Sequence, residues 1–284
     1  MDDQEELFKK IDSVINNIRI FKKEPEFSNE LKKREERTPG LLGDDNETLR
    51  HLARLIAYSQ NADSGLVNGM LAANTFDQVF ESFDVSKVAK MDKNIIVNKY
   101  WIKKNECSVN TKWNQLTVIR QQGKIDSVIR CAISLQSIRV KHGSFVNLLS
   151  NSGIPLKLFS KTDIEIFWDR VDNLKKELTE LEMPFYKNTT SLLHLLLHIG
   201  YPCLKPDLVV MKEAKKFGAI DCDSDKTSRN LKKAITFFQY YSISRNINPT
   251  VLDFYLLVDG GQQWAKGYID QSYYSLNSKS LCPN

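Results

Sequence analysis

The sequence predicts an all-α protein of roughly ten helices. Apolar residues recur three and four positions apart in one segment after another, which is the spacing of a helix with one buried face. Strict alternation of apolar and polar residues over the length of a strand is missing, and β-branched residues stand inside the helical patterns. With 284 residues, the chain can bury a substantial core as one large domain or two modest ones.

The first 44 residues differ from the rest because charged side chains of both signs dominate them. This segment ends in KKREERTPGLLGDD, where Pro39, Gly40 and Gly43 break any helix that the charged run begins. The sequence therefore predicts a charged N-terminal appendage over residues 1–44 and a helical core over residues 45–284.

The core opens with a clear helical pattern in ETLRHLARLIAYSQNA, where Leu49, Leu52, Leu55 and Ile56 recur at helical spacing. Similar patterns predict helices in SGLVNGMLAA, FDQVFESF, VSKVAKM and GKIDSVIRCAISLQSIRVKHG. Later helices are predicted in DIEIFWDRVDNLKKELTELE, TTSLLHLLLHIG, PDLVVMKEAKKFG, KTSRNLKKAITFFQYYS and NPTVLDFYLLVDGGQQW.

Composition and charge set wide bounds on function. The formal net charge of +5, from 40 Lys and Arg against 35 Asp and Glu, allows a polyanionic partner without requiring one. The five cysteines are scattered without a CxxC pair, so neither a zinc site nor a disulfide framework is indicated. No apolar run approaches the ~20 residues of a membrane helix, and the N-terminus MDDQEELFKK lacks an apolar core. We therefore expect an intracellular protein with no membrane partner.

One acidic residue stands out at the junction of two predicted helices. TTSLLHLLLHIG is apolar nearly all round, as a central buried helix is, and Gly200 can supply the left-handed residue that ends it. After the connector YPCL, Lys205 and Pro206 lead into Asp207 at the start of the next helix. An aspartate there accepts hydrogen bonds from the first free amides and suits the positive end of the helix dipole. A helix cap thus explains Asp207 without any chemistry.

The same segment resembles a family of enzymes. In the helix-hairpin-helix superfamily of DNA base-excision glycosylases, a hairpin L-P-G-V-G-x-x-T-A precedes a buried helix and the motif V-P-V-D-x-H-V-x-R-x-A-x-R-L-G, whose Asp is catalytic. LKPDLVVMKEAKKFG is similar in register, with Asp207 on the catalytic Asp and Gly218 on the last Gly. Upstream, MPFYKNTTSLL resembles a degenerate hairpin that keeps Pro184 and Thr190.

Two further stretches fit this resemblance. LARLIAYSQNA is similar to the superfamily's early helix, and FESFDVSKVAKM with IRQQGKIDSVIRCAISLQSIRVKHGSF resembles the DNA-3-methyladenine glycosylase I branch. The resemblance covers about residues 47–260 and implies two helical lobes with a central cleft. One lobe would hold residues 66–200, and the other residues 45–65 and 201–284.

The departures from the family pattern bear on activity. Phe185 and Lys187 replace the hairpin glycines, whose lack of a side chain lets backbone amides approach a phosphate. The family position of a Schiff-base lysine falls nearest Asn188, an amide that cannot form an imine, although a one-residue gap would place Lys187 there. The cysteines of the iron-sulfur members and the zinc set of the glycosylase I branch are absent. The resemblance thus implies a monofunctional glycosylase without cofactor or metal.

The resemblance also implies roles for other residues in a monomer that binds double-stranded DNA. Phosphates would be held by Lys187, Asn188, Thr189 and Thr190. Gln60 or Asn61 would fill the gap left by the flipped nucleotide, and Tyr58 and Tyr186 would border the base pocket. His194 and His198 stand four apart, as two metal ligands can, but the intervening LLL and the lack of a third ligand favour packed imidazoles.

Three classes of function remain open on the sequence alone. The first is a DNA glycosylase in which Asp207 stabilises a cationic sugar. The second is a catalytically inactive DNA-binding module of the same fold, favoured by the degraded hairpin. The third is a structural all-α protein in which Asp207 only caps a helix.

Overall fold

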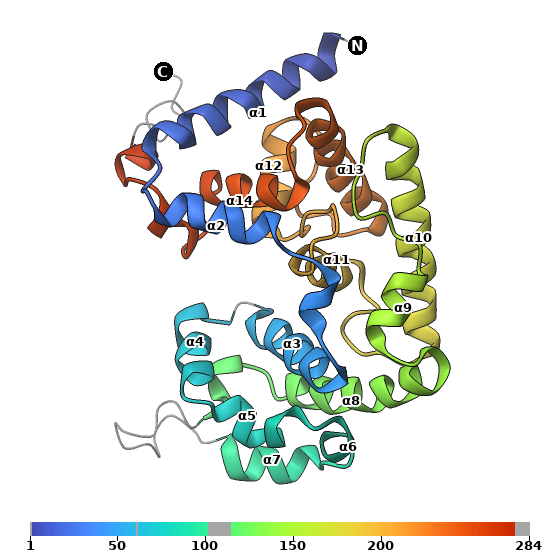
Figure 1. The fold of residues 1–284 in the computed structure, drawn as a ribbon. Helices are drawn as coiled ribbons and strands as arrows, with labels where there is room; N and C mark the ends of the chain where they lie inside the picture. The colour runs from blue at the N-terminus through green and yellow to red at the C-terminus, as the bar shows by residue number, and fades with distance from the viewer. Residues whose placement is uncertain (1, 61, 102–114, 276–284) are drawn as a thin grey trace. The chain divides into compact units, whose positions relative to one another are not determined.

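The computed structural model describes residues 2–60, 62–101 and 115–275 (Figure 1). The described chain is helical and forms no strand; its one β-bridge pairs Lys22 with Ile269. The predicted all-α class is therefore confirmed. The chain divides into two compact units, with residues 1–38, 155–169 and 189–284 in unit 1 and residues 39–154 and 170–188 in unit 2.

Unit 1 is built around α14, which contacts α1, α2, α12, α13 and η6 of this unit. Its N-terminal side chain cap is Asn248, and Pro249 occupies the first turn, where a missing amide hydrogen costs nothing. Nearly every residue of α14 is buried, as its apolar sequence predicts. The helices of this unit are α1 (Asp2–Phe21), α2 (Glu26–Glu35), α11 (Thr189–His198), α12 (Leu208–Lys216), α13 (Ser228–Arg245), α14 (Pro249–Asp259) and the 3-10 helix η6 (Ala265–Tyr268).

Unit 2 is built around α8, which packs against α3, α6, α7 and α9. Acidic caps start several of its short helices, and Phe76, Phe80 and Phe83 form an aromatic cluster with ring centroids 5.1 to 5.8 Å apart. Its elements are η1 (Pro39–Leu42), α3 (Asp45–Tyr58), α4 (Ser64–Ala72), α5 (Thr75–Val79), η2 (Glu81–Phe83), α6 (Val85–Val88), α7 (Lys93–Tyr100), η5 (Leu116–Ile119), α8 (Gly123–His142) and α9 (Phe145–Asn151). The helix α10 (Lys161–Glu180) contributes residues to both units.

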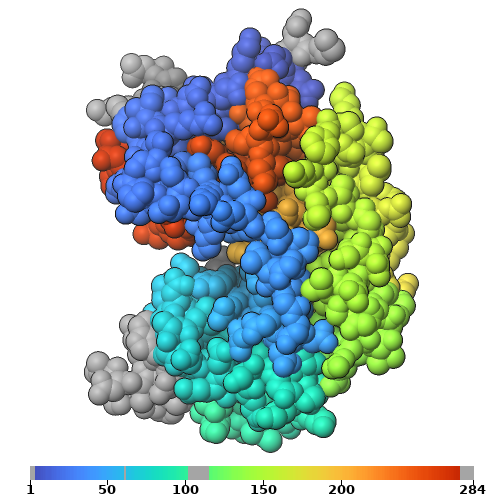
Figure 2. All heavy atoms as spheres, viewed as in Figure 1, coloured from blue at the N-terminus to red at the C-terminus, as the bar shows by residue number. Residues whose placement is uncertain are grey.

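The N-terminal segment forms part of the core of unit 1, where the sequence predicts an appendage. In α1, Phe8, Ile11, Ile15 and Ile18 are buried, and in α2 the ring of Phe27 is packed within the unit. In the space-filling view these first residues (blue) lie against the C-terminal helices of the same unit (orange to red; Figure 2). The dense charge masks an apolar stripe at helical spacing, and this stripe is sufficient to bury one face of each helix.

The boundaries of the two units differ from the predicted lobes. Residues 45–65 fall in unit 2, where α3 packs on α8, and not with residues 201–284. Residues 189–200 fall in unit 1. The physical reason is that α3 carries a wide apolar face, from Leu49 to Ala57, which is buried within unit 2.

Candidate functional site

The path into Asp207 begins at the end of α11, where the chain turns sharply. Gly200 has a φ of +83°, so the predicted left-handed residue is confirmed. A Cβ atom at this position would lie 2.1 Å from the carbonyl oxygen of Arg37, so no larger residue fits without moving the backbone. Arg37 in turn donates from Nη1 to the carbonyl of Leu197 at 3.4 Å. The end of α11 is thereby fixed against the residues that follow α2.

The connector between α11 and α12 is held by buried side chains. Gln239, which is fully buried on α13, donates to the carbonyl of Pro202 at 2.8 Å. The same amide accepts a hydrogen bond from the indole of Trp168 at 3.0 Å, which orients it. The Cys203 thiol, also buried, contacts the carbonyl of Leu193 at 3.5 Å. The connector is therefore a rigid approach to the start of α12.

Asp207 caps α12 with one oxygen of its carboxylate. Oδ1 accepts hydrogen bonds from the amides of Val209 at 3.0 Å and Val210 at 3.1 Å. Oδ2 takes part in neither bond, and its ion-pair partner is Nζ of Lys205 at 4.0 Å. The Asp207 side chain keeps 26% of its surface exposed. The predicted cap is confirmed, and the second oxygen is available to solvent or to a ligand.

A buried ion pair positions the residue two places before Asp207. The amide of Lys205 donates to Oδ1 of Asp253 at 3.2 Å, and Oδ2 of Asp253 accepts from Arg34 at 3.1 Å. Arg34 and Asp253 are 5% and 1% exposed. Arg34 also donates to Glu30 at 2.9 Å and to the carbonyl of Thr250 at 3.0 Å. An arginine from the N-terminal segment thus fixes the backbone beside Asp207.

The electrostatics of this cluster follow from its burial. Burial raises the pKa of Asp253, the nearby negative charge of Asp207 raises it further, and Arg34 acts in the opposite direction. Burial lowers the pKa of Arg37 to about 10, with the positive charge of Arg34 adding to the effect. Arg34 and Asp253 are functional candidates that sequence patterns do not reveal, because they are 219 residues apart.

The residues predicted around the early helix lie in unit 2. Tyr58 is half-buried at the end of α3, where its hydroxyl bonds Asn68 and burial raises its pKa. Gln60 is exposed and adopts a φ of +53°, which is uncommon outside glycine. Asn61 lies outside the described residues.

A buried lysine holds the turn that contains Tyr58 and Gln60. Lys124, from the first turn of α8, donates from Nζ to the carbonyls of Ser59 at 2.6 Å and Ala57 at 3.2 Å. It thereby satisfies carbonyl groups that α3 leaves without intrahelical partners. Burial lowers its pKa to about 8, and the positive charge of Arg120 contributes. Lys124 belongs to the predicted helix GKIDSVI, but nothing in the sequence indicates that its side chain holds this turn.

The predicted hairpin residues have mixed environments. Tyr186 is fully buried and donates to the carbonyl of Leu52 at 2.7 Å, so its ring presents no surface to a base in this structure. Lys187 and Asn188 are exposed in unit 2. Phe185, which stands where the resemblance has a glycine, has a φ of +66°. This is a left-handed backbone conformation, which favours glycine and is uncommon for a residue with a large side chain.

Thr189 and Thr190 begin α11 in unit 1 and are both partly exposed. Further along this helix, the rings of His194 and His198 meet edge to face with centroids 4.8 Å apart. Within the described ranges, no group of three His, Cys, Asp or Glu side chains is arranged to hold a metal ion.

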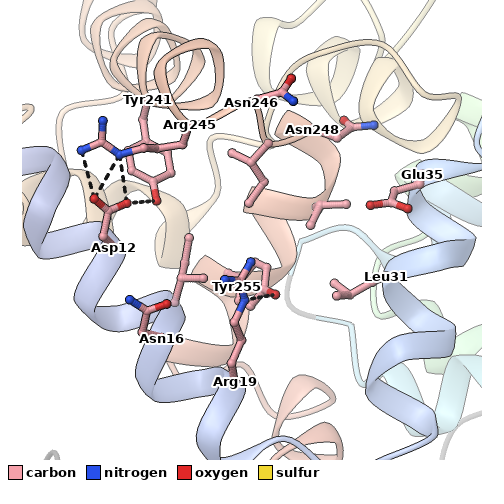
Figure 3. A pocket seen from close by; sticks show the side chains of 13 residues that line it. Asp12, Asn16, Arg19, Leu31, Glu35, Tyr241, Arg245, Asn246, Asn248 and Tyr255 are labelled. Atoms are coloured by element: carbon pink, nitrogen blue, oxygen red, sulfur yellow. Dashed lines mark hydrogen bonds and ion pairs between the residues drawn. The ribbon is translucent and has the colours of Figure 1, made fainter.

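Unit 1 also has a cavity of about 540 Å³ among α1, α2, α13 and α14 (Figure 3). On one wall, Arg245 pairs with Asp12, and the Tyr241 hydroxyl donates to the same carboxylate at 2.7 Å. On another, Arg19 donates to the Tyr255 hydroxyl at 3.3 Å. Asp207 is not among the residues that line this cavity.

Comparison with protein-family models, with curated proteins and with solved structures gave no match to this chain. Among the described residues, no helix has both the length and the apolar character needed to cross a bilayer. The site around Asp207 therefore stands on its own geometry: a capped carboxylate with one open oxygen, an amine beside it and a buried ion pair behind it.

Proposed function

We propose that the protein is a DNA glycosylase, which hydrolyses the N-glycosidic bond of a damaged or modified base flipped out of double-stranded DNA. The observation that carries this proposal is that the two oxygens of the Asp207 carboxylate have different partners. Oδ1 is fixed by two backbone amides, while Oδ2 is left to face a substrate. Capping and catalysis then act together, because the cap holds the charge in one place.

The chemistry needs a fixed negative charge and no cofactor. Breaking the bond between base and sugar builds positive charge on the sugar ring, as in glycoside hydrolysis. A preorganised carboxylate stabilises that charge without having to reorient, and it can also orient or deprotonate the attacking water. Asp207 would take both roles, and Asp253 and Arg34 would keep its backbone in position.

The hairpin supports a role in DNA binding as part of the same proposal. Phe185, which stands where the resemblance has a glycine, adopts a left-handed backbone conformation of the kind that favours glycine. The exposed side chains of Lys187 and Asn188, with Thr189 and Thr190 at the start of α11, supply donors to phosphate oxygens. The glycosylase-like fold with a central cleft belongs to this proposal as well.

The test is base release from a panel of duplexes, each with one modified base. We expect the wild-type protein to release at least one of these bases and Asp207→Asn to release none at a comparable rate. An inactive DNA-binding module is the second candidate, favoured by the exchange of both hairpin glycines for Phe185 and Lys187. Salt-sensitive duplex binding without release of any base from the panel would favour that module over the enzyme.

A further inference from the structure

The cavity of unit 1 among α1, α2, α13 and α14 is separate from the Asp207 site (Figure 3). Its volume of about 540 Å³ falls within the range of about 300–1,000 Å³ that is usual for small-molecule sites. Its charged lining residues balance, because they are two acids and two arginines: Asp12, Glu35, Arg19 and Arg245. Such a lining disfavours a ligand with a large net charge, since part of that charge would be left unpaired.

On the wall formed by α1 and α13, the charges satisfy one another. Arg245 donates from Nε to Oδ2 of Asp12 at 3.0 Å, and its Nη2 pairs with Glu5 at 2.6 Å. The Tyr241 hydroxyl donates to Oδ1 of Asp12 at 2.7 Å. This wall is therefore closed by its own hydrogen bonds and offers a ligand little free charge.

The other two charges, on Arg19 and Glu35, are in a different state. Nε of Arg19 donates to the hydroxyl of Tyr255 at 3.3 Å, which orients the guanidinium and leaves both terminal nitrogens for a ligand. Tyr255 is 2% exposed, so this anchor is fixed by the core. Within the part of the chain that the structure describes, no carboxylate pairs with Arg19 and no basic side chain pairs with Glu35. The two side chains extend from different helices toward the cavity (Figure 3).

The rest of the lining is apolar or carries amides. The Asn248 carboxamide oxygen accepts from the amide of Thr250 at 2.9 Å and from its hydroxyl at 3.0 Å, so the nitrogen of this carboxamide is left to donate to a ligand carbonyl. Four apolar side chains also line the cavity, those of Ile15, Leu31, Ile247 and Val251. A ligand that fits this lining has an apolar body and a charge of each sign.

We propose that this cavity binds a small zwitterion of the amino-acid type, either a free apolar amino acid or an apolar dipeptide. Its carboxylate accepts two parallel hydrogen bonds from the terminal nitrogens of Arg19, which is the geometry that a guanidinium favours. Its ammonium group donates to Glu35, and its side chains cover the apolar part of the lining. The site uses neither Asp207 nor DNA, so it does not depend on the proposed glycosylase activity.

Isothermal titration calorimetry of the full-length protein tests this site with leucine and with leucyl-leucine, which distinguishes the amino acid from the dipeptide. Each ligand is also titrated with its amine acetylated and, separately, with its carboxylate amidated. We expect one of the two free ligands to bind with one-to-one stoichiometry. Either blocked form should bind more weakly by about tenfold or more, because it loses one charge-assisted hydrogen-bonding group.

Two variants assign each end of the ligand to one side chain. In Glu35→Gln, the free and the acetylated ligand should bind equally, and in Arg19→Gln the free and the amidated ligand should bind equally. Glu36→Gln is the matched control, because Glu36 is the next residue, is exposed and does not line the cavity. It should leave all affinities unchanged. Thermal unfolding confirms that the variants are folded, which we expect because Arg19 and Glu35 are exposed.

The proposal is overturned if neither leucine nor leucyl-leucine binds, or if the blocked forms bind as well as the free ones. It is also overturned if folded Arg19→Gln and Glu35→Gln bind the free ligand as tightly as Glu36→Gln does. Base release from a damaged duplex is a separate measurement, so none of these results removes the proposed glycosylase.

Discussion

At each end of α12, two carboxylates lie close to basic side chains. The two clusters differ in whether a carboxylate oxygen remains accessible. At the start of the helix, Asp207 is a quarter exposed and has one oxygen without an amide donor. At its end, Glu213 and Asp259 are both buried, and each pairs with Lys216. The Tyr273 hydroxyl also donates to Asp259. The first cluster offers a free acceptor, whereas the second uses its acceptors internally.

The comparison shows that a large pKa shift does not by itself mark the reactive site. Burial raises the pKa of Glu213 to about 8, and the neighbouring Asp259 charge adds to the effect. Such shifts often mark catalytic groups, but ion-pair networks inside a fold produce them too. Here Glu213, whose pKa is strongly raised, is buried. Asp207 is partly exposed and is held in position by its neighbours. Access and orientation therefore distinguish the two ends.

Removing the ion pair behind Asp207 should give the largest effect. Arg34→Met leaves Asp253 buried without its partner, and breaking such a pair typically costs about 3–5 kcal/mol. Arg245→Met is the matched control, because Arg245 pairs with Asp12 and Glu5 in a more exposed setting, where about 1 kcal/mol or less is expected. Urea denaturation measures both. Equal losses in the two variants would contradict the structural role of the buried pair.

The carboxylate itself should affect catalysis far more than stability. Asp207→Asn keeps the shape and most of the capping capacity, since Asn caps about as well as Asp, so at most ~1 kcal/mol of stability should be lost. Base release should fall about a hundredfold, because ~3 kcal/mol of transition-state stabilisation disappears. Glu213→Gln, at the closed end of the helix, should leave the rate per folded molecule unchanged. An undiminished rate in folded, DNA-bound Asp207→Asn would reduce Asp207 to a cap.

The buried cluster of Glu213, Asp259 and Lys216 should affect how the free energy of unfolding depends on pH. Because the pKa of Glu213 is raised from 4.5 to about 8, the folded state binds more protons than the unfolded state between these values. The free energy of unfolding should therefore fall as pH rises from about 5 to 8, by at most about 1.4 kcal/mol per unit from this group. Chemical denaturation at several pH values should show a flatter profile for Glu213→Gln. An unchanged slope in that variant would contradict the assignment.

The smallest effect concerns affinity for DNA. Asp207→Asn removes a negative charge from an accessible surface, so binding to an undamaged duplex should be equal or a few-fold tighter. Glu213→Gln should not alter it, because that side chain is buried. Fluorescence anisotropy at several salt concentrations measures both, and log affinity should fall linearly with log salt. Binding that is absent at low salt, or insensitive to salt, would argue against any DNA-binding function.

The local features near the site were predictable because they depend on neighbouring residues in the sequence. The apolar pattern of TTSLLHLLLHIG predicts a buried helix, Gly200 predicts its end, and the residues that follow place Asp207 at the next helix start. The contacts that the N-terminal segment makes within unit 1 were not predictable in the same way. Its charge suggests an appendage, although its apolar residues pack into unit 1 and its Arg34 supports the site.

The sequence by itself determined the all-α class, the cap at Asp207 and the glycine-terminated helix before it, since backbone hydrogen bonding and helical periodicity are local properties. Only the tertiary structure decided which charged side chains form ion pairs. Arg34 and Asp253 form an ion pair although they are 219 residues apart in the sequence. Their contact depends on how α2 and α14 pack against each other. Ion pairs between distant segments leave no periodic signal in a sequence, because each partner alone is indistinguishable from a solvated surface charge.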